Sequence, residues 1–268
     1  MKELVSLAES AARAAGAILR SYFQQEYTIT HKGLDDPVTN ADTEADAFLK
    51  EKLLSACPDY GWLSEESADS AERLTKLRVW IVDPLDGTKE FIAGRPEFMV
   101  SIGLAENGQP LLGVLYNPIN DELFSAYKGK GAFLNGSRIF STKTKTLSEA
   151  RLIVSRSELT ENLWQPYRHF FKTLQPCGSV AYKLAQVASG KADIHISLKP
   201  KNEWDICAAH CLLKESGAEL IGRNGQPIAY NRANPIISGG LIAGNERLVG
   251  QVLCRAIPDY NPGGKSPV

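Results

Sequence analysis

The stretch VDPLDGTKEF, residues 82–91, carries two aspartates three positions apart, Asp83 and Asp86, directly after an apolar run. Carboxylate oxygens are the preferred ligands of hard cations such as Mg²⁺. Gly87 follows them, and a residue without a Cβ lets a backbone amide approach a phosphate closely. The next residues, TKEFIAG, could form a short helix whose N-terminus would hold an anion. The stretch therefore favours a metal-assisted phosphate site.

Acidic residues far from this stretch could complete such a site. The segments DDPVTNAD, SEES and EWD supply Asp35, Asp36, Asp42, Glu65, Glu66, Glu203 and Asp205. No His-x-x-x-His or Cys-x-x-Cys pattern accompanies them, so the set favours oxygen ligands. Carboxylates gathered without a cation would repel one another and hold protons, so we expect metal dependence. Asp35, Asp46 and Glu66 are expected to be solvated surface residues.

The first half of the chain shows the periodicity of two helices and several strands. Apolar residues recur at helical spacing over 3–23, and a second helix is expected to begin near Thr39–Asp42 and end before Pro58. The run at 79–83 is typical of a buried strand. Turn residues separate three more apolar segments, which predict an antiparallel meander: 98–106, 110–118 and 122–129. Asn135-Gly136 predicts a hairpin.

The polar segment 141–150 is the predicted boundary between a lobe of residues 1–148 and a lobe of residues 149–268. Strand and helix patterns alternate beyond it, which favours an α/β arrangement. The expected strands are 151–157, 192–198 and 218–222. The expected helices are 161–174 around a proline, 178–190 opened by Ser179, and 204–217 ending at a glycine. The tail, 259–268, is predicted to be disordered.

The composition of the 268 residues narrows the functional classes. The net charge of −1 gives no reason to expect a nucleic-acid polymer or a membrane surface as partner. No apolar run approaches the roughly 20 residues of a membrane span, and the N-terminal segment lacks the apolar region of a signal peptide. Five scattered cysteines argue against a disulfide framework and favour free thiols. We therefore expect a cytoplasmic protein.

Four ordered motifs resemble those of the inositol monophosphatase superfamily, the lithium-sensitive, Mg²⁺-dependent phosphomonoesterases. WIVDPLDGTKEF looks like the family signature, and DDPVTNADTEAD resembles its Asp-x-Val-Thr-x-x-Asp segment. SEES is similar to its Gly-Glu-Glu segment, with Ser64 in place of glycine. EWDICAAHCLLKESGAEL resembles its second signature, Trp-Asp-x-Ala-Ala-Gly, with His210 where glycine is usual. The resemblance covers most of the chain and implies an α/β (α+β) fold, a two-lobed, layered αβαβα sandwich of the sugar-phosphatase type.

The resemblance implies a metal centre with two or three Mg²⁺ ions. It gives Glu65 as a ligand of the first metal, Asp83 as the bridge between two metals, and the carbonyl of Leu85 as a further ligand of the first. Asp86 and Asp205 would hold the second metal. Two divalent ions roughly 4 Å apart can stabilise both the attacking and the leaving oxygen of an in-line displacement.

The resemblance also implies the residues around the attacking water and the substrate. Asp42 and Thr88 would orient the water, and they form the catalytic group together with Glu65. The amides of Gly87 and Thr88 would bind the phosphate. Further substrate contacts are expected from Gly178, Ser179, Lys183, Lys199 and Lys201.

Two sequence features favour one branch of the superfamily. DGTKEF replaces the DGT-x-N-F typical of inositol monophosphatases, and VSRSE resembles the Ser-Arg-Ser of 3′(2′),5′-bisphosphate nucleotidases. That branch removes the 3′-phosphate of adenosine 3′,5′-bisphosphate, a by-product of sulfate assimilation. Lys183 lies one residue later than in the Gly-Ser-Ser-x-Lys of the branch, a shift of about 100° on a helix. Inositol monophosphate and fructose 1,6-bisphosphate are the alternative substrates, and a homodimer is possible.

Three other interpretations of the motifs stay open at this point. A haloacid-dehalogenase-type phosphatase would place its two aspartates two apart and use the first as a covalent nucleophile. Cys207, His210 and Cys211 could form a zinc site on one helical face, although a buried helix is the simpler interpretation. A family member that had lost activity could act as a binding protein, but the acidic motif residues are all present.

Overall fold

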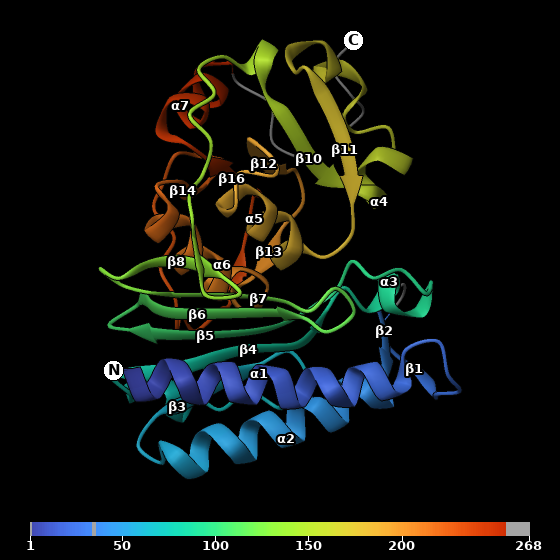
Figure 1. Ribbon diagram of the computed structural model, residues 1–268, viewed down its shortest axis with the longest axis vertical. Helices are drawn as coiled ribbons and strands as arrows, with labels where there is room; N and C mark the ends of the chain where they lie inside the picture. The colour runs from blue at the N-terminus through green and yellow to red at the C-terminus, as the bar shows by residue number, and fades with distance from the viewer. Residues whose placement is uncertain (1, 34–35, 256–268) are drawn as a thin grey trace.

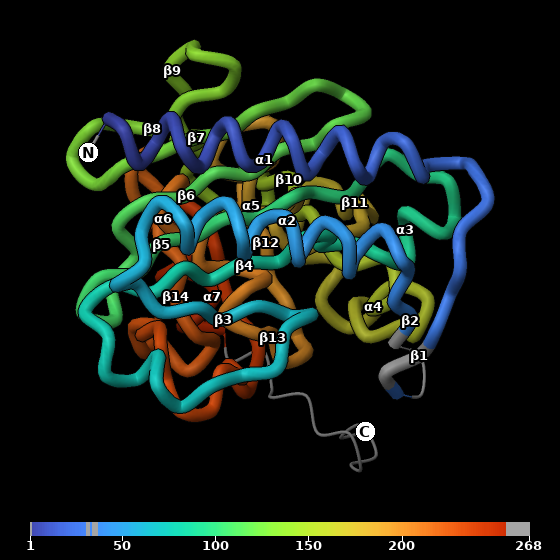
Figure 2. The backbone as a smooth tube through the Cα atoms, turned by 90° about the horizontal axis from the view of Figure 1, so that it is seen from below, coloured from blue at the N-terminus to red at the C-terminus, as the bar shows by residue number. Residues whose placement is uncertain are grey.

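The computed structural model describes residues 2–33 and 36–255, and these residues form five stacked layers (Figure 1). The first layer contains α1 (Lys2–Tyr22) and α2 (Asn40–Ala56), which lie side by side across one face of a sheet (Figure 2). That sheet has seven strands in the order β3 (Gly61–Ser64), β4 (Arg78–Asp86), β5 (Met99–Glu106), β6 (Gln109–Asn117), β7 (Glu122–Tyr127), β8 (Gly131–Leu134) and β9 (Ser137–Ile139).

The remaining layers come from the second half of the chain. The central layer contains α5 (Val180–Ala188) and α6 (Glu203–Ser216). A second sheet follows, in the order β11 (Thr173–Cys177), β10 (Arg151–Ser155), β12 (Ile194–Ser197), β16 (Leu241–Gly244) and β14 (Glu219–Gly222). On its outer face lie α7 (Glu246–Cys254) and the short 3-10 helices η2 (Leu147–Glu149) and η3 (Gln165–Phe170). The predicted layered sandwich is therefore confirmed.

Short elements complete the fold around the cleft and the edges. They are α3 (Thr88–Ile92), α4 (Arg156–Thr160), η1 (Ala71–Thr75) and the strand pairs β1 (Ile29–Gly33) with β2 (Asp36–Thr39) and β13 (Lys201–Asn202) with β15 (Ile236–Ile237). The segment 141–150 joins β9 of the first sheet to β10 of the second, and the division into two lobes at this segment stays a prediction.

Two glycines in the first sheet let α6 approach it closely. Gly103 of β5 and Gly113 of β6 are paired neighbours. A Cβ on Gly113 would lie 2.0 Å from the carbonyl oxygen of Ala208, and a Cβ on Gly103 would lie 2.7 Å from the Sγ of Cys207. Any side chain at these positions would push the helix away. The close approach matters because Asp205 lies in the first turn of the same helix.

Most predicted elements of the first half are confirmed with shifts of one or two residues. The second helix begins after a capping box, in which the Thr39 side chain and the Asp42 carboxylate each bond the other's backbone. The meander β5–β6–β7 is antiparallel throughout. Asn135 and Gly136 have φ values of 47° and 78°, which the predicted two-residue hairpin turn requires.

The helix predicted at 161–174 is wrong. Only Gln165–Phe170 forms a 3-10 helix there, and Thr173–Cys177 is a strand parallel to β10. The strand contains Pro176, but β11 lies at the edge of its sheet, where a missing amide donor costs no ladder bond. The tail predicted to be disordered, 259–268, lies outside the described residues.

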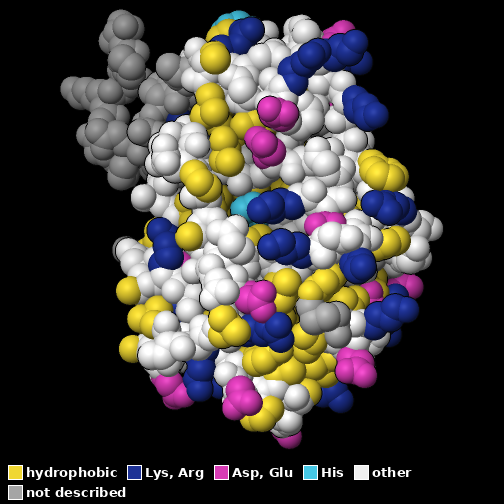
Figure 3. Space-filling view, turned by 90° about the vertical axis from the view of Figure 1, so that its left-hand side faces the viewer, with side chains coloured by type: hydrophobic (Ala, Val, Ile, Leu, Met, Phe, Trp, Pro, Cys, Tyr) yellow, Lys and Arg dark blue, Asp and Glu magenta, His cyan; other side chains and the backbone are white. Residues whose placement is uncertain are grey.

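The distribution of surface charge and the state of the cysteines agree with what the composition led us to expect. The face in Figure 3 shows basic and acidic side chains without a large field of one sign, and hydrophobic side chains gather in its lower part. All five cysteines are free thiols. Within residues 2–33 and 36–255, every helix is too short or too polar to cross a bilayer.

Candidate active site

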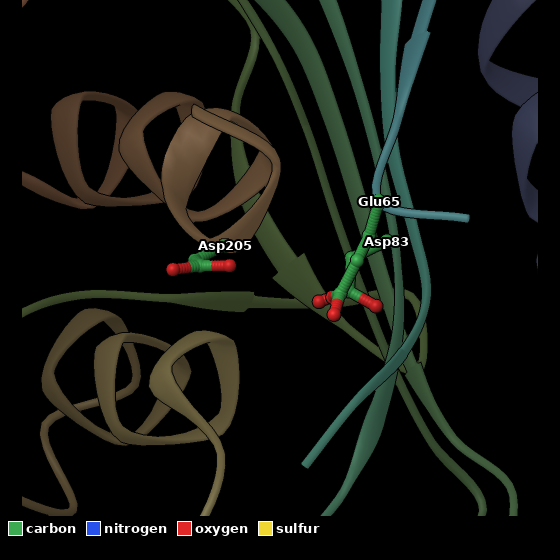
Figure 4. A group of neighbouring side chains, drawn as sticks. All are labelled: Glu65, Asp83 and Asp205. Atoms are coloured by element: carbon green, nitrogen blue, oxygen red, sulfur yellow. The ribbon is translucent and has the colours of Figure 1, made fainter. Parts of the chain in front are cut away.

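Three carboxylates from separate parts of the chain come together near the C-terminal end of β4. Glu65 follows β3, Asp83 lies in β4, and Asp205 lies in the first turn of α6 (Figure 4). Each residue offers one oxygen, and these oxygens lie within 4.8 Å of one another. Asp83 is buried and the other two are half-buried. Among the described residues this is the group that could hold a cation, and its all-oxygen donor set suits Mg²⁺.

The protonation of this group reflects its crowding. Burial raises the pKa of Asp83 well above its usual range, and the charges of Glu65, Asp86 and Asp205 raise it further. Burial, followed by the charge of Asp86, raises the pKa of Asp205 to about 7. Carboxyls in this state hold protons near neutral pH unless a cation offsets their charge. The residues therefore fit a bound divalent metal, with Glu65, Asp83 and Asp205 as ligands.

The turn after Asp83 is held by the carboxylate itself. The amide of Leu85 donates to Asp83 Oδ1 at 2.9 Å, and the pairing of β4 with β5 shifts register between Asp83 and Asp86. This irregularity turns the chain out of the sheet toward α3. The Leu85 carbonyl accepts from the Thr88 hydroxyl at 3.2 Å. Leu85 lines the cleft, and its metal contact stays a prediction.

Asp86 has a structural partner that the sequence did not reveal. Its carboxylate accepts from Ser179 Oγ at 2.6 Å, from the Val180 amide at 3.2 Å and from the Ala181 amide. These donors form the first turn of α5, so Asp86 ties β4 to the N-terminus of that helix. Asp86 lies outside the three-carboxylate group, and its predicted contact with a second metal remains untested.

Asp42 and Thr88 meet as predicted. Thr88 Oγ1 lies 3.0 Å from Asp42 Oδ1. The other oxygen of Asp42 accepts from the Thr39 amide at 2.8 Å and from the Thr39 hydroxyl at 2.6 Å. Burial raises the pKa of Asp42, although the hydrogen bonds from Thr39 and Thr88 oppose this effect. The pair can therefore orient a water through the Thr88 hydroxyl and take up a proton at Asp42.

Gly87 begins α3 in a conformation that other residues rarely adopt. Its φ is +109°, and a Cβ would lie 3.0 Å from the Glu97 carbonyl oxygen. Its carbonyl accepts from the Glu90 and Phe91 amides at 2.9 and 3.0 Å. The short helix expected after the glycine is confirmed. The predicted binding of phosphate by amides at this turn stays a prediction.

One cleft of about 410 Å³ is lined by Glu65, Asp83, Leu85, Asp86, Gly87, Thr88 and Asp205, whereas Asp42 is not among its lining residues. Gly178, Ser179, Lys183 and Lys201 also line the cleft, and their contact with substrate stays a prediction. Lys199 is not among the lining residues, and its ammonium instead pairs with Glu161 at 2.5 Å.

Lys183 is occupied by the backbone. Its side chain is buried, and Nζ donates to the carbonyls of Ser179 at 2.6 Å and Gly178 at 3.1 Å. Burial lowers its pKa. The ammonium thus supports the loop before α5, and a contact with substrate would have to compete with these carbonyls.

Arg156 is a cleft residue that the site prediction missed. Its Nε donates to Glu90 at 3.3 Å, and Nη2 donates to Glu97. Glu97 also accepts from the Gly178 amide at 2.8 Å. Through Glu90 and Glu97, Arg156 of α4 is therefore linked both to α3 and to the loop before α5, at the edge of the cleft. The available signal was the VSRSE segment, which contains Arg156.

Two further expectations are decided by burial. Asp46 is not a surface residue, because it is 5% exposed and accepts from the hydroxyls of Ser64 and Ser67. Glu66 is half-buried and therefore partly exposed, and Asp35 lies outside the described residues. The zinc alternative finds no support: Cys207 and Cys211 are buried in the core, and His210 Nδ1 lies 2.9 Å from the Tyr230 hydroxyl.

Comparison with known proteins agrees with this geometry. Residues 1–260 match the family model for the inositol monophosphatase family. "Inositol monophosphatase 3" of Solanum lycopersicum is 35% identical over 84% of this chain and 88% of its own, and "3′(2′),5′-bisphosphate nucleotidase CysQ" of Aggregatibacter actinomycetemcomitans is 31% identical over 87% and 89%. The extragenic suppressor protein suhB of Bartonella henselae superposes with a TM-score of 0.83 at 29% identity, over 95% of this chain and 98% of that one.

Proposed function

The chain belongs to the inositol monophosphatase family, and from that premise we propose that it is a Mg²⁺-dependent phosphomonoesterase that hydrolyses adenosine 3′,5′-bisphosphate. The observation that carries the proposal is the convergence of Glu65, Asp83 and Asp205, whose oxygens lie within 4.8 Å of one another. A metal-dependent reaction would explain why a fold gathers these charges in a cleft, where burial and neighbouring carboxylates raise the pKa of Asp83 and of Asp205.

Each chain segment has a distinct task in the proposed reaction. Glu65, Asp83 and Asp205 would hold Mg²⁺, with Asp86 and the Leu85 carbonyl as further ligands. Bound Mg²⁺ would make a water more acidic and offset the charge of the phosphoryl group and of the leaving oxygen. Acidic side chains thereby become part of a site that accepts an anionic substrate.

The attacking water needs a fixed position and a proton acceptor. The Thr88 hydroxyl donates to Asp42, so its lone pairs remain to accept a hydrogen bond from a water. Asp42 has a raised pKa because it is buried, which makes it a better proton acceptor than an exposed aspartate. Proton transfer along this pair would need no covalent intermediate on the enzyme.

The choice of a bisphosphate substrate is supported by the cations that line the cleft with the carboxylates. Lys201 lines the cleft and could bind a phosphate that is not being hydrolysed, whereas Arg156, which also lines it, is paired with Glu90 and Glu97. Inositol monophosphate is the second candidate, because the tomato relative carries that activity in its name. A homodimer and a cytoplasmic location remain parts of the proposal.

Phosphate release from three substrates would test the proposal. Adenosine 3′,5′-bisphosphate, inositol 1-phosphate and fructose 1,6-bisphosphate are compared with Mg²⁺ and with a chelator. We expect release only with Mg²⁺ and the highest kcat/KM for the nucleotide. Lys201→Ala should raise KM for the nucleotide more than for inositol phosphate, whereas Lys172→Ala, an exposed lysine outside the cleft, should change neither. Faster turnover of inositol phosphate would reject the nucleotide assignment.

A further inference from the structure

A second aspartate of α2 contacts the loop that carries Glu65. Asp46 is 5% exposed, and its two oxygens accept from Ser64 Oγ and Ser67 Oγ. The two serines lie on either side of Glu65 in the sequence. One carboxylate therefore holds both flanks of the segment that presents a proposed metal ligand.

Two backbone amides of this loop also make hydrogen bonds. The Glu65 amide donates to the Val82 carbonyl at 3.3 Å, and the Glu66 amide donates to the Ser64 hydroxyl at 3.4 Å. Beyond Ser64 the ladder of β3 with β4 ends, so the backbone leaves the sheet at this point. Hydrogen bonds to a carboxylate are stronger than those between neutral groups. The bonds from Ser64 and Ser67 to Asp46 are thus well suited to hold the loop.

The same helix holds the other half of the site. Asp42 and Asp46 are four residues apart in α2, so their side chains lie on one face. Asp42 contacts the Thr88 hydroxyl at 3.0 Å, and Asp46 contacts the loop of Glu65. One turn of α2 thereby links the position of the water-orienting hydroxyl to that of the metal-binding carboxylate.

We propose that Asp46 is a positioning residue that sets metal affinity by holding Glu65 in place through Ser64 and Ser67. The inference rests on the proposed metal site. Residues that orient metal ligands typically change metal affinity by about 10- to 100-fold when they are replaced. Asp46→Ala should therefore raise the Mg²⁺ concentration for half-saturation by at least about 10-fold, while kcat at saturating Mg²⁺ and KM for the substrate change little.

A purely structural role makes a different prediction. Loss of buried hydrogen bonds alone would lower the unfolding temperature and leave the metal affinity of the folded protein unchanged. Leu53→Ala provides the matched control, because this buried residue of α2 lies in the apolar core and makes no hydrogen bond to the loop. It should lower the unfolding temperature without changing Mg²⁺ half-saturation.

The test measures thermal unfolding against Mg²⁺ concentration without substrate, because a ligand of the folded state stabilises it in proportion to ln(1 + [L]/Kd). Wild type, Asp46→Ala, Asp46→Asn, Ser67→Ala and Leu53→Ala are compared. We expect the largest shift in apparent Kd for Asp46→Ala and smaller shifts for Asp46→Asn and Ser67→Ala, which keep part of the contacts.

The outcomes separate the inference from the proposed function. If Mg²⁺ fails to stabilise even wild type, the proposed metal site is wrong. If Mg²⁺ stabilises wild type and the Asp46 and Ser67 variants with the same apparent Kd, the metal site stands and the role of Asp46 is refuted. If Asp46→Ala does not fold, Asp46→Asn and Ser67→Ala decide the question by the same criterion.

Discussion

Replacing Asp83 by asparagine should make the metal-free protein more stable and abolish its response to Mg²⁺. The two side chains have nearly the same shape, and the asparagine keeps an Oδ1 that can accept from the Leu85 amide, as Asp83 does at 2.9 Å. The change removes one negative charge from the group with Glu65 and Asp205. Most buried polar substitutions destabilise a protein, so a gain in stability would be a distinctive result.

The magnitude follows from the spacing of the carboxylates. Two unit charges 4.8 Å apart repel by about 3.5 kcal/mol at an effective dielectric constant of about 20. Asp83 faces two such neighbours, but protonation of Asp83 itself relieves part of the repulsion, because its pKa is raised well above the usual range. We expect a net gain of about 2 kcal/mol at pH 8, which corresponds to a rise in unfolding temperature of about 4–8 °C.

The assay is thermal unfolding at pH 8 in chelator and in excess Mg²⁺, with phosphate release measured in parallel. Mg²⁺ should stabilise wild type but not Asp83→Asn, and turnover of the variant should be lost. Asp59→Asn, which alters an exposed aspartate, is the control and should behave as wild type. A metal-free Asp83→Asn protein that melts below wild type, or one that Mg²⁺ stabilises equally, would refute the reasoning.

The other predictions concern the water, the cleft loop and the core. Thr88→Ala should lower kcat by about 10²-fold with little change in KM, because the hydroxyl that contacts Asp42 is lost. Thr88→Ser keeps a hydroxyl and should retain most of the rate. An alanine variant with full activity would argue against this role. Gly178→Ala should lower the free energy of unfolding by about 1–3 kcal/mol, because the new Cβ would lie 2.0 Å from the side chain of Glu90. Gly250→Ala is the control, because a Cβ there would have nothing within 4 Å, and it should be neutral or stabilising. Urea unfolding measures both changes. Burial lowers the pKa of His210 to about 3, so the folded protein keeps this histidine neutral while the unfolded chain takes up a proton below about pH 6.5. The free energy of unfolding should therefore fall as the pH is lowered from about 6.5 toward 3. His210→Gln should reduce that slope by about 1.4 kcal/mol per pH unit, and an unchanged slope would contradict the prediction.

Asp83 and Asp86 were predictable from a local pattern, whereas the roles of Glu65 and Asp205 were implied by the resemblance of their motifs to those of a known family. Asp83 and Gly87 come at the end of an apolar strand, and the helix that carries Asp205 was marked by the glycine at its end. Charged residues at strand and helix ends face solvent or a ligand far more often than the core, which makes such motifs informative. The meander and the hairpin at Asn135-Gly136 were predictable for the same reason, since turn chemistry acts over two to four residues.

Features that depend on distant partners were not predictable. Asp46 has the pattern of an exposed charge on a helix, and no pattern shows that Ser64 and Ser67 would bury it. Lys183 has the pattern of an available cation, yet three backbone carbonyls surround its ammonium within 3.5 Å. Arg156 could not be paired with Glu90 and Glu97 from spacing, because the contact joins segments about 60 residues apart.

The β11 strand was missed for a different reason. A proline within a short segment argues against a strand, and the helix expected over 161–174 included the first two residues of this one. Its place at the sheet edge, which removes the penalty for proline, is a property of the assembled sheet and not of the segment.

The most direct test of the central claim is diffraction from crystals soaked in Mn²⁺, which substitutes for Mg²⁺ at oxygen sites and gives an anomalous signal. At least one strong anomalous peak is expected within bonding distance of the carboxylate oxygens of Glu65 and Asp83, with Asp205 facing the same site. Peaks confined to other parts of the surface, with this cleft empty at saturating Mn²⁺, would contradict that claim.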